Sequence, residues 1–449
     1  MMNMLALLQC IRPNLSQTNV RRMSRVIQAI LSMTGRVTML GLSRWAGKGG
    51  SYRTVQRFFN AAIPWPQVFG QFFQHHLHRP ESEYFLVGDE CVATKSGKQT
   101  YGLDHFFSGL LSKVVKGIAL FSLSLVDVNE RCSYPLRVEQ VVRPEAEKAV
   151  AKANQKKKAK KSKTRGKVGR PKGGQNRDKT QVELTPELKR IQSMVQKQLE
   201  ILQAVVTIRY LALDGHFGNN KALQMVLQCG LHLISKLRHD SALYFCYDGP
   251  QKSKGPRKKY GKKVDYRNLP EKYLVEQSIE GDIETRIYQV KMLHRGFAQP
   301  LNVVIVTKTN LKTGAFANVN LFSSDLELCY EKIIDYYSLR FQIEFNFRDA
   351  KQYWGLEDFM NIKEVPLTNA LNLSLFMVNI SQVLLREFRQ TNPESGILDL
   401  KAYFRAAKYF EETIKMLPEK PEPLLLEQIF GHVASLGCIH PVNVHLSSP

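Results

Sequence analysis

The chain has 449 residues, a formal net charge of +24 and a pI near 9.7. Such an excess of cations predicts a polyanionic partner. Nucleic acid is the favoured partner, and an anionic membrane surface is the alternative. No apolar run reaches the eighteen or so residues that a spanning helix needs. The seven cysteines are scattered without a CxxC pair, which argues against a disulfide framework or a zinc site and fits a reducing cytoplasm.

Residues 1–75 are expected to form a helical DNA-binding domain. Apolar and basic positions alternate at helical spacing through residues 21–60, and LSRWAGKGGSYRTVQRFF is typical of helix, glycine-rich turn and helix. Ser51 is the expected N-cap of the second helix, on which Arg53 and Arg57 would share one face. This shape is that of a helix-turn-helix reading a major groove, and a plain helical hairpin with exposed arginines gives the same pattern.

A first acidic candidate follows an apolar strand. EYFLVGDECVATK predicts a buried strand with Asp89 at or near its exit, and KVVKGIALFSLSLVDV and CSYPLRVEQVV complete an antiparallel meander that opens a mixed sheet. Asp89 is the expected catalytic acid of this region, although a turn role fits as well. Glu90 and Asp104 are rival acids: Glu90 would face the opposite side of a continuing strand, and Asp104 lies in an expected loop.

Residues 144–182 form a basic insert that is expected to be disordered on its own. Thirteen Lys or Arg and no acid lie within residues 148–177. Its centre, VGRPKGG, resembles an AT-hook that would place Arg170 and Lys172 along a narrow minor groove. A non-specific phosphate-binding tether is the alternative, and both bind nucleic acid.

A second acidic candidate lies at a strand-to-helix turn. Thr185 is the expected N-cap of a helix that runs to about Gln203. VVTIRYLALDGHFGNN then predicts a strand ending in Asp214, followed by a helix that Gly230 ends and by a further strand, LHLISKLR. Asp214 would therefore lie at the ligand-binding end of an α/β sheet, although Asp-Gly is also a common turn pair.

Residues 239–325 are expected to be a β-rich insertion and residues 361–449 a helical region. The insertion contains a basic run, residues 252–263, with seven Lys or Arg, and its loop is expected to contact DNA. In the C-terminal region, residues 367–389 and 398–417 predict amphipathic helices that serve dimerisation or core packing. The apolar stripe of MVNISQVLLREF favours the core.

Residues 336–354, YYSLRFQIEFNFRDAKQYW, predict one continuous helix. Tyr337, Arg340, Glu344 and Lys351 would fall within an arc of roughly 60° on it, while its apolar residues point mostly elsewhere. A carboxylate beside two cations suits a metal ion next to a phosphate backbone. A solvated face with an ordinary i, i+4 ion pair gives the same pattern.

With these residues the chain resembles the DDE transposases of bacterial insertion sequences, and more narrowly the insertion-sequence-four family, over about residues 83–360. The resemblance rests on three acids and one spacing signature: Asp89, Asp214, Glu344 and Tyr337-x2-Arg340-x3-Glu344-x6-Lys351. It implies an α/β fold of the RNase H-like type, a mixed sheet flanked by helices. The catalytic core would comprise residues 80–238 and 326–360 around the insertion.

The resemblance also implies a chemistry. The three acids would hold two Mg²⁺ ions, with Mn²⁺ as a substitute, and Tyr337, Arg340 and Lys351 would position phosphates. Double-stranded DNA, both element ends and target, would be cut and joined by a bacterial, nucleoid-associated homodimer, with a hairpin intermediate. Two departures are the long basic insert and the lack of a Trp in the insertion, where hairpin-forming relatives use one to hold a flipped base. A catalytically inactive DNA-binding protein and a structure-specific nuclease of the same fold are the alternatives.

Overall fold

The computed structural model describes residues 3–109, 111–144, 178–419 and 421–440. Arg170, Lys172 and most of the basic insert lie outside the described residues. The expectations for them stay predictions.

A large mixed sheet forms the centre of the fold, with its strands hydrogen-bonded in the order β2-β3-β1-β5-β6-β12-β11-β10-β7-β8, β4 on β3 and β9 on β10. Of the recorded pairings, β1 with β5 and β5 with β6 are parallel and the others antiparallel. The strands are β1 Tyr84–Thr94, β2 Asp104–Ser108, β3 Lys113–Asp127, β4 Cys132–Val141, β5 Tyr210–Leu213, β6 His232–Leu237, β7 Leu243–Cys246, β8 Tyr260–Lys263, β9 Leu274–Glu280, β10 Ile283–His294, β11 Leu301–Asn310 and β12 Phe316–Ser323. The expected mixed α/β class is confirmed, and so is the β1-β3-β4 meander.

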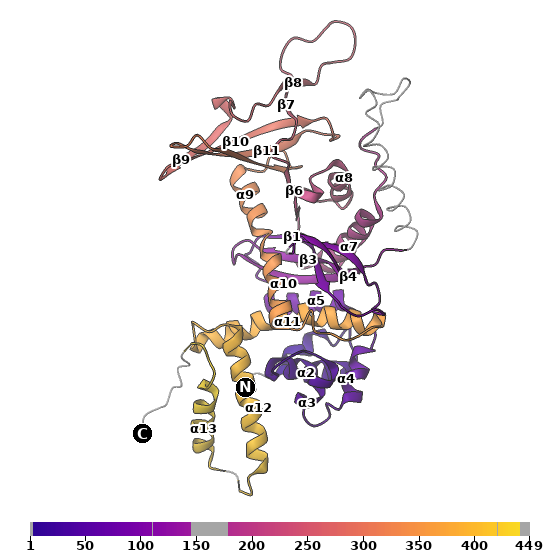
Figure 1. Ribbon diagram of the computed structural model, residues 1–449, viewed down its shortest axis with the longest axis vertical. Helices are drawn as coiled ribbons and strands as arrows, with labels where there is room; N and C mark the ends of the chain where they lie inside the picture. The colour runs from indigo at the N-terminus through magenta and orange to yellow at the C-terminus, as the bar shows by residue number, and fades with distance from the viewer. Residues whose placement is uncertain (1–2, 110, 145–177, 420, 441–449) are drawn as a thin grey trace.

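Helices cover the sheet and extend below it (Figure 1). They are α1 Met4–Leu7, α2 Gln17–Ser32, α3 Met39–Trp45, α4 Tyr52–Phe59, α5 Trp65–Phe72, α7 Pro186–Leu202, α8 Asn220–Gln228, α9 Tyr330–Leu339, α10 Gln342–Gln352, α11 Glu364–Thr391, α12 Ile397–Met416 and α13 Pro423–Ser435. Short helical turns are η1 Leu8–Ile11, η2 Phe73–Leu77, η3 Gly215–Phe217 and η4 Glu271–Tyr273.

The long helix α11 separates the sheet from the lower helices. It packs on β4 from one side and on α4 and α12 from the other, and it crosses the molecule below the sheet in Figure 1. Among the described residues it is the one helix long and apolar enough to cross a membrane, yet 89% of its apolar window is buried within the protein. The interpretation of this segment as core is therefore confirmed.

Local sequence signals explain several boundaries. The Ser51 hydroxyl accepts from the Thr54 amide at the start of α4, and the Thr185 hydroxyl accepts from the Leu188 amide at the start of α7, as the N-cap prediction requires. Gly230, with a φ of +74°, ends α8 where a left-handed conformation is needed.

Three sequence predictions are wrong in detail. The expected single helix of residues 336–354 is broken: α9 ends at Leu339, α10 begins at Gln342, and the amides of Phe341, Ile343 and Glu344 bond three residues back instead of four. Asp104 is not in a loop but begins β2. Asp89 lies in the middle of β1, because pairing with the long strand β3 carries β1 on to Thr94.

The helix α10 is held at its centre and just beyond its C-terminal end. In its centre the buried Asn346 side-chain amide donates to the hydroxyls of Ser124 and Ser133, at 3.3 and 2.7 Å. After it, Trp354 is fully buried, and Gly355 has a φ of +74° with a Cβ position only 2.4 Å from the Val37 side chain. The active-site candidates on α10 are thereby attached to the sheet and to the N-terminal helices.

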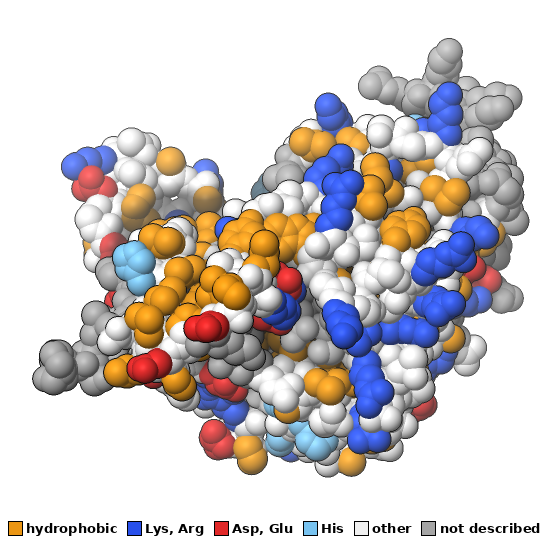
Figure 2. Space-filling view, turned by 90° about the horizontal axis from the view of Figure 1, so that it is seen from below, with side chains coloured by type: hydrophobic (Ala, Val, Ile, Leu, Met, Phe, Trp, Pro, Cys, Tyr) orange, Lys and Arg blue, Asp and Glu red, His pale blue; other side chains and the backbone are white. Residues whose placement is uncertain are grey.

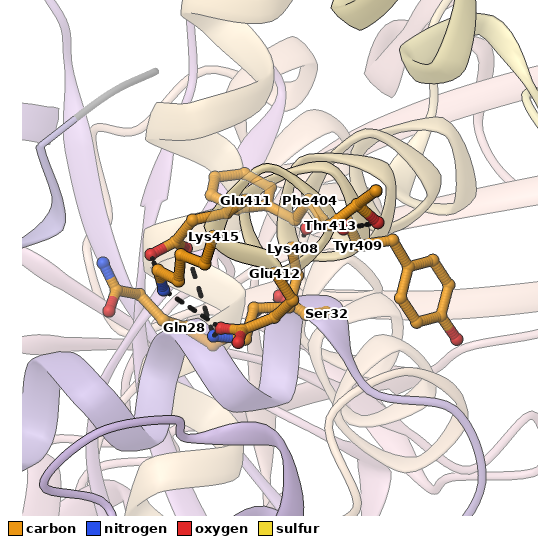
Figure 3. Close-up of polar contacts among 9 residues, drawn as sticks. All are labelled: Gln28, Ser32, Phe404, Lys408, Tyr409, Glu411, Glu412, Thr413 and Lys415. Carbon is orange, nitrogen blue, oxygen red and sulfur yellow. Dashed lines mark hydrogen bonds and ion pairs between the residues drawn. The ribbon is translucent and has the colours of Figure 1, made fainter. Parts of the chain in front are cut away.

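The helix α12 extends this attachment to the C-terminal region. The Ser32 hydroxyl of α2 donates to the Phe404 carbonyl of α12 at 3.3 Å (Figure 3). The Lys401 ammonium donates to the Ile30 and Tyr353 carbonyls, and burial lowers its pKa to about 8. One side chain of α12 therefore ties the N-terminal helices to the end of α10.

Candidate active site

Two of the three predicted acids come together at the parallel strand pair of the sheet. Gly88 of β1 is in register with Leu213 of β5, and Asp89 and Asp214 follow them directly. Neighbouring strands lie about 4.8 Å apart and residues in register face the same side, so the two carboxylates are neighbours. Burial raises the pKa of Asp89, and the Asp214 charge raises it further. Both residues keep partial exposure.

The turn after β5 orients Asp214. Its Oδ1 accepts from the His216 amide at 3.2 Å, and its carbonyl accepts from the Ser235 hydroxyl at 2.8 Å. The return of the chain beside β6 requires glycine at position 218, because a Cβ there would lie 2.2 Å from the Lys236 carbonyl oxygen. The sequence analysis did not single out Gly218 or Ser235, although the second glycine of DGHFGNN was a signal for a close backbone approach.

Glu344 reaches the same region through Arg340. One nitrogen of the Arg340 guanidinium, Nη1, lies 2.9 Å from Asp89 Oδ2, and the other, Nη2, lies 3.8 Å from Glu344 Oε1. The Arg340 side chain is only 12% exposed. Burial and the Asp89 charge raise the pKa of Glu344, while Arg340 lowers it. The guanidinium therefore bridges two carboxylates that would otherwise repel each other.

This arrangement has the donor chemistry of a Mg²⁺ site but not a closed cage. Carboxylate oxygens are the ligands that Mg²⁺ prefers, and crowded carboxylates gain from a divalent cation. Within the part of the chain that the structure describes, however, no group of three or more His, Cys, Asp or Glu side chains is arranged to hold a metal ion. The residues present suit the ion chemically, with the Arg340 cation between two of them.

The other residues of the spacing signature divide between two places. Tyr337, near the end of α9, has its ring 5.6 Å from the Arg340 guanidinium carbon. Lys351 instead donates to the Val92 carbonyl at 3.1 Å and pairs with Glu357 at 3.0 Å. Arg340 and Lys351 therefore both lie against β1, but neither is open to solvent chemistry in this structure, because Arg340 is engaged by Asp89 and Lys351 by the Val92 carbonyl and Glu357.

The rival acids lie away from this site. Glu90 faces the opposite side of β1, where Glu187 and His216 are among its charged neighbours. Asp104 caps the start of β2, and its carboxylate accepts from the His105 amide.

The N-terminal region carries an excess of positive charge, of which Arg36 and Arg79 pair with Asp358 and Glu130. Residues 1–80 contain ten Lys or Arg and no Asp or Glu. Arg53 and Arg57 are exposed on α4, as expected. Seen from below, Lys and Arg side chains gather on the side of the molecule where the N-terminal helices lie (Figure 2).

The cations of α12 are different in this respect. Two of them pair with glutamates of the same helix, with Lys408 2.8 Å from Glu412 and Lys415 2.6 Å from Glu411 (Figure 3). Lys401 and Arg405 donate to backbone carbonyls. The attraction for a polyanion is therefore expected to be stronger on the N-terminal helices than on α12.

A comparison with protein families gives one match. The family described as DDE superfamily endonuclease matches residues 7–295, nearly two thirds of the chain. This match includes Asp89 and Asp214 and stops before Glu344. No curated protein matches the chain.

Proposed function

The chain belongs to the DDE superfamily endonuclease family, and from this premise we propose that it is a DNA transposase. It cuts at the ends of an insertion sequence and joins them to target DNA, with a hairpin intermediate. The Y-R-E-K spacing supports the insertion-sequence-four family, and the mixed sheet is compatible with an RNase H-like core of residues 80–238 and 326–360.

One observation carries this proposal. Asp89 and Asp214 follow the register pair Gly88–Leu213 of two parallel strands, and Glu344 joins them through a shared arginine. Three acids far apart in the sequence thus enter one electrostatic cluster. An isolated turn acid or a solvated helix face would not produce this convergence.

Each side chain then has a role. Asp89, Asp214 and Glu344 are the ligands for two Mg²⁺ ions, or for Mn²⁺ as a substitute; when bound, such ions activate water or a 3′-hydroxyl and stabilise the leaving oxygen. Arg340 and Tyr337 lie beside the acids, where they position the phosphate of the scissile strand. Lys351 reaches a phosphate only after leaving Glu357.

The DNA duplex would extend from the acids to other basic parts of the chain. Arg53 and Arg57 of the domain at residues 1–75 contact the element end, and Arg170 and Lys172 of the insert contact a minor groove. The protein acts as a homodimer on paired ends in the bacterial cytoplasm, at the nucleoid. The region of residues 361–449 packs on the core and serves this assembly.

The decisive experiment replaces one ligand. Asp214→Asn keeps the size and the hydrogen bonds of the side chain but removes its charge, so Mg²⁺-dependent cleavage of element ends should be lost while DNA binding is retained. The ends are identified by inverted repeats flanking the coding gene. Cleavage at the wild-type rate would exclude Asp214 as a ligand.

The family description also supports a structure-specific endonuclease as the second candidate. Such an enzyme would cut branched DNA without joining ends. A strand-transfer assay with pre-cut ends separates the two, because only a transposase inserts them into a plasmid.

A further inference from the structure

A wide groove lies on the β-rich insertion, far along the sheet from the acids. It has a volume of about 990 Å³ and is bordered by β7, β8 and the loop after β10. In the sheet order, β7 of the groove is six strands away from β1. At about 4.8 Å for each strand, the groove and the acids are separated by a distance on the order of 30 Å. The groove is therefore separate from the candidate active site.

The groove carries an excess of positive charge. Lys179, Lys258 and Lys259 line it, all three are exposed, and among the described residues none of them pairs with a carboxylate. Its acid, Asp178, is engaged by the amide and hydroxyl of Thr180. A surface of this kind attracts an extended polyanion.

Of the aromatic residues that line the groove, Tyr247 and Tyr260 have a cation over the ring and Phe297 packs against His294 and Phe322. The Lys258 ammonium lies 4.3 Å from the centre of the Tyr247 ring. Arg295 stands over Tyr244 and Tyr260, at 4.9 and 5.9 Å. Because these ring faces are covered by the protein's own cations, they do not offer free stacking platforms for unpaired bases. The groove favours phosphates over bases.

We propose that this groove binds the backbone of duplex DNA about nine base pairs from the site of cleavage, independently of base sequence. The spacing follows from roughly 30 Å of separation and a rise of about 3.4 Å for each base pair. This inference rests on the proposed DNA substrate and adds a second contact that holds the duplex in line with the acids. The described part of the chain resumes at Asp178, which lies on the border of the groove. The thirteen Lys and Arg of residues 148–177 come directly before it in the sequence.

The native cysteines provide a direct test. Cys246 lines the groove and Cys329 lies outside it, and both are exposed. The full-length protein is treated with N-ethylmaleimide, with and without a 30-bp duplex of arbitrary sequence, and both sites are quantified by peptide mass spectrometry. With the duplex at about ten times its dissociation constant, roughly one tenth of the protein is free, so modification of Cys246 should slow about tenfold. Cys329 should keep its rate.

A charge variant gives the second measurement. Combined substitution of Lys179, Lys258 and Lys259 by alanine should reduce the slope of log K against log salt by up to about 2.7, from about 0.9 for each lost phosphate contact. The control removes three exposed cations of the same region that already have acidic partners: Arg238→Ala, Lys291→Ala and Lys312→Ala. Its slope should change by less than about one.

The outcomes distinguish this site from the catalytic function. Unchanged Cys246 labelling, equal slopes for the two triple variants, or protection by a 30-nucleotide single strand but not by the duplex would each overturn the groove assignment. The groove variant should still cleave a short element end that stops before the groove in a Mg²⁺-dependent reaction. A wild-type protein that binds no DNA at all would overturn the proposed function together with the groove.

Discussion

The arginine between the acids allows a quantitative prediction. Arg340 and Asp89 form an ion pair at 2.9 Å, with side chains only 12% and 20% exposed. Truncating one partner of a buried pair costs about 3–5 kcal/mol, and the remaining exposure reduces this to about 2–4 kcal/mol for Arg340→Ala. The loss arises because the carboxylate of Asp89 stays half-buried beside Asp214 without its cation.

A divalent ion should restore part of this loss. Mg²⁺ at about ten times its dissociation constant stabilises a folded protein by about 1.4 kcal/mol. In the wild type the ion competes with the guanidinium for Asp89 and Glu344, so its stabilising effect should be smaller there than in Arg340→Ala. The measurement is urea unfolding followed by tryptophan fluorescence, with and without Mg²⁺, in both proteins.

The control is Arg348, an exposed arginine of α10. Arg348 pairs with Asp349 at 2.9 Å but is 57% exposed, so Arg348→Ala should cost less than about 1 kcal/mol and should not change the effect of Mg²⁺. If Mg²⁺ stabilises the wild type and Arg340→Ala equally, the guanidinium does not occupy the place of a metal ion.

Further predictions concern the supports of the site. Asn346→Ala leaves two buried serine hydroxyls without their donor and should destabilise by about 1–3 kcal/mol in urea, and kcat should fall more than KM because α10 loses its position. Gly355→Ala should lower the thermal midpoint, since a Cβ would strike Val37 and the φ is positive. Replacing Arg53 and Arg57 together by alanine should reduce the salt slope of DNA binding by about 1.8 without changing the thermal midpoint. Lys401 is protonated in the unfolded chain but loses its proton above about pH 8 in the fold. Wild-type stability relative to Lys401→Met should therefore rise as the pH increases from about 8 to 10.5, as measured by urea unfolding at several pH values.

Sequence periodicity predicted much of the fold because the responsible forces are local. Ser51 and Thr185 cap their helices through a hydroxyl three residues from the amide it accepts, and such a contact is readable from the residues alone. The three strands of the meander were likewise visible as apolar runs. The end of β1 could not be predicted in this way. Its position depends on hydrogen bonds to β3, a strand distant in sequence, which continue past Asp89 to Thr94.

The partners of Arg340 and Lys351 could not be predicted for the same physical reason. On the sequence, Arg340 and Lys351 share a helical face, since spacing is all that a single helix provides. In the fold, each is attracted to a group far away in the chain: Arg340 to Asp89, and Lys351 to the Val92 carbonyl. Both groups belong to β1, so the shared face is kept, but the partners that hold the two cations on it are tertiary and are not contained in the spacing.

The break between α9 and α10 connects these observations. At this junction the amides of Phe341, Ile343 and Glu344 bond to the third preceding residue, and the guanidinium of Arg340 reaches Asp89. The same turn leaves Glu344 in the first turn of α10, 3.8 Å from the guanidinium, so a single side chain balances two acids. Because Arg340 would also serve as a phosphate ligand, binding of metal and of DNA are expected to be coupled through it: an ion that takes the carboxylates frees the cation for the substrate.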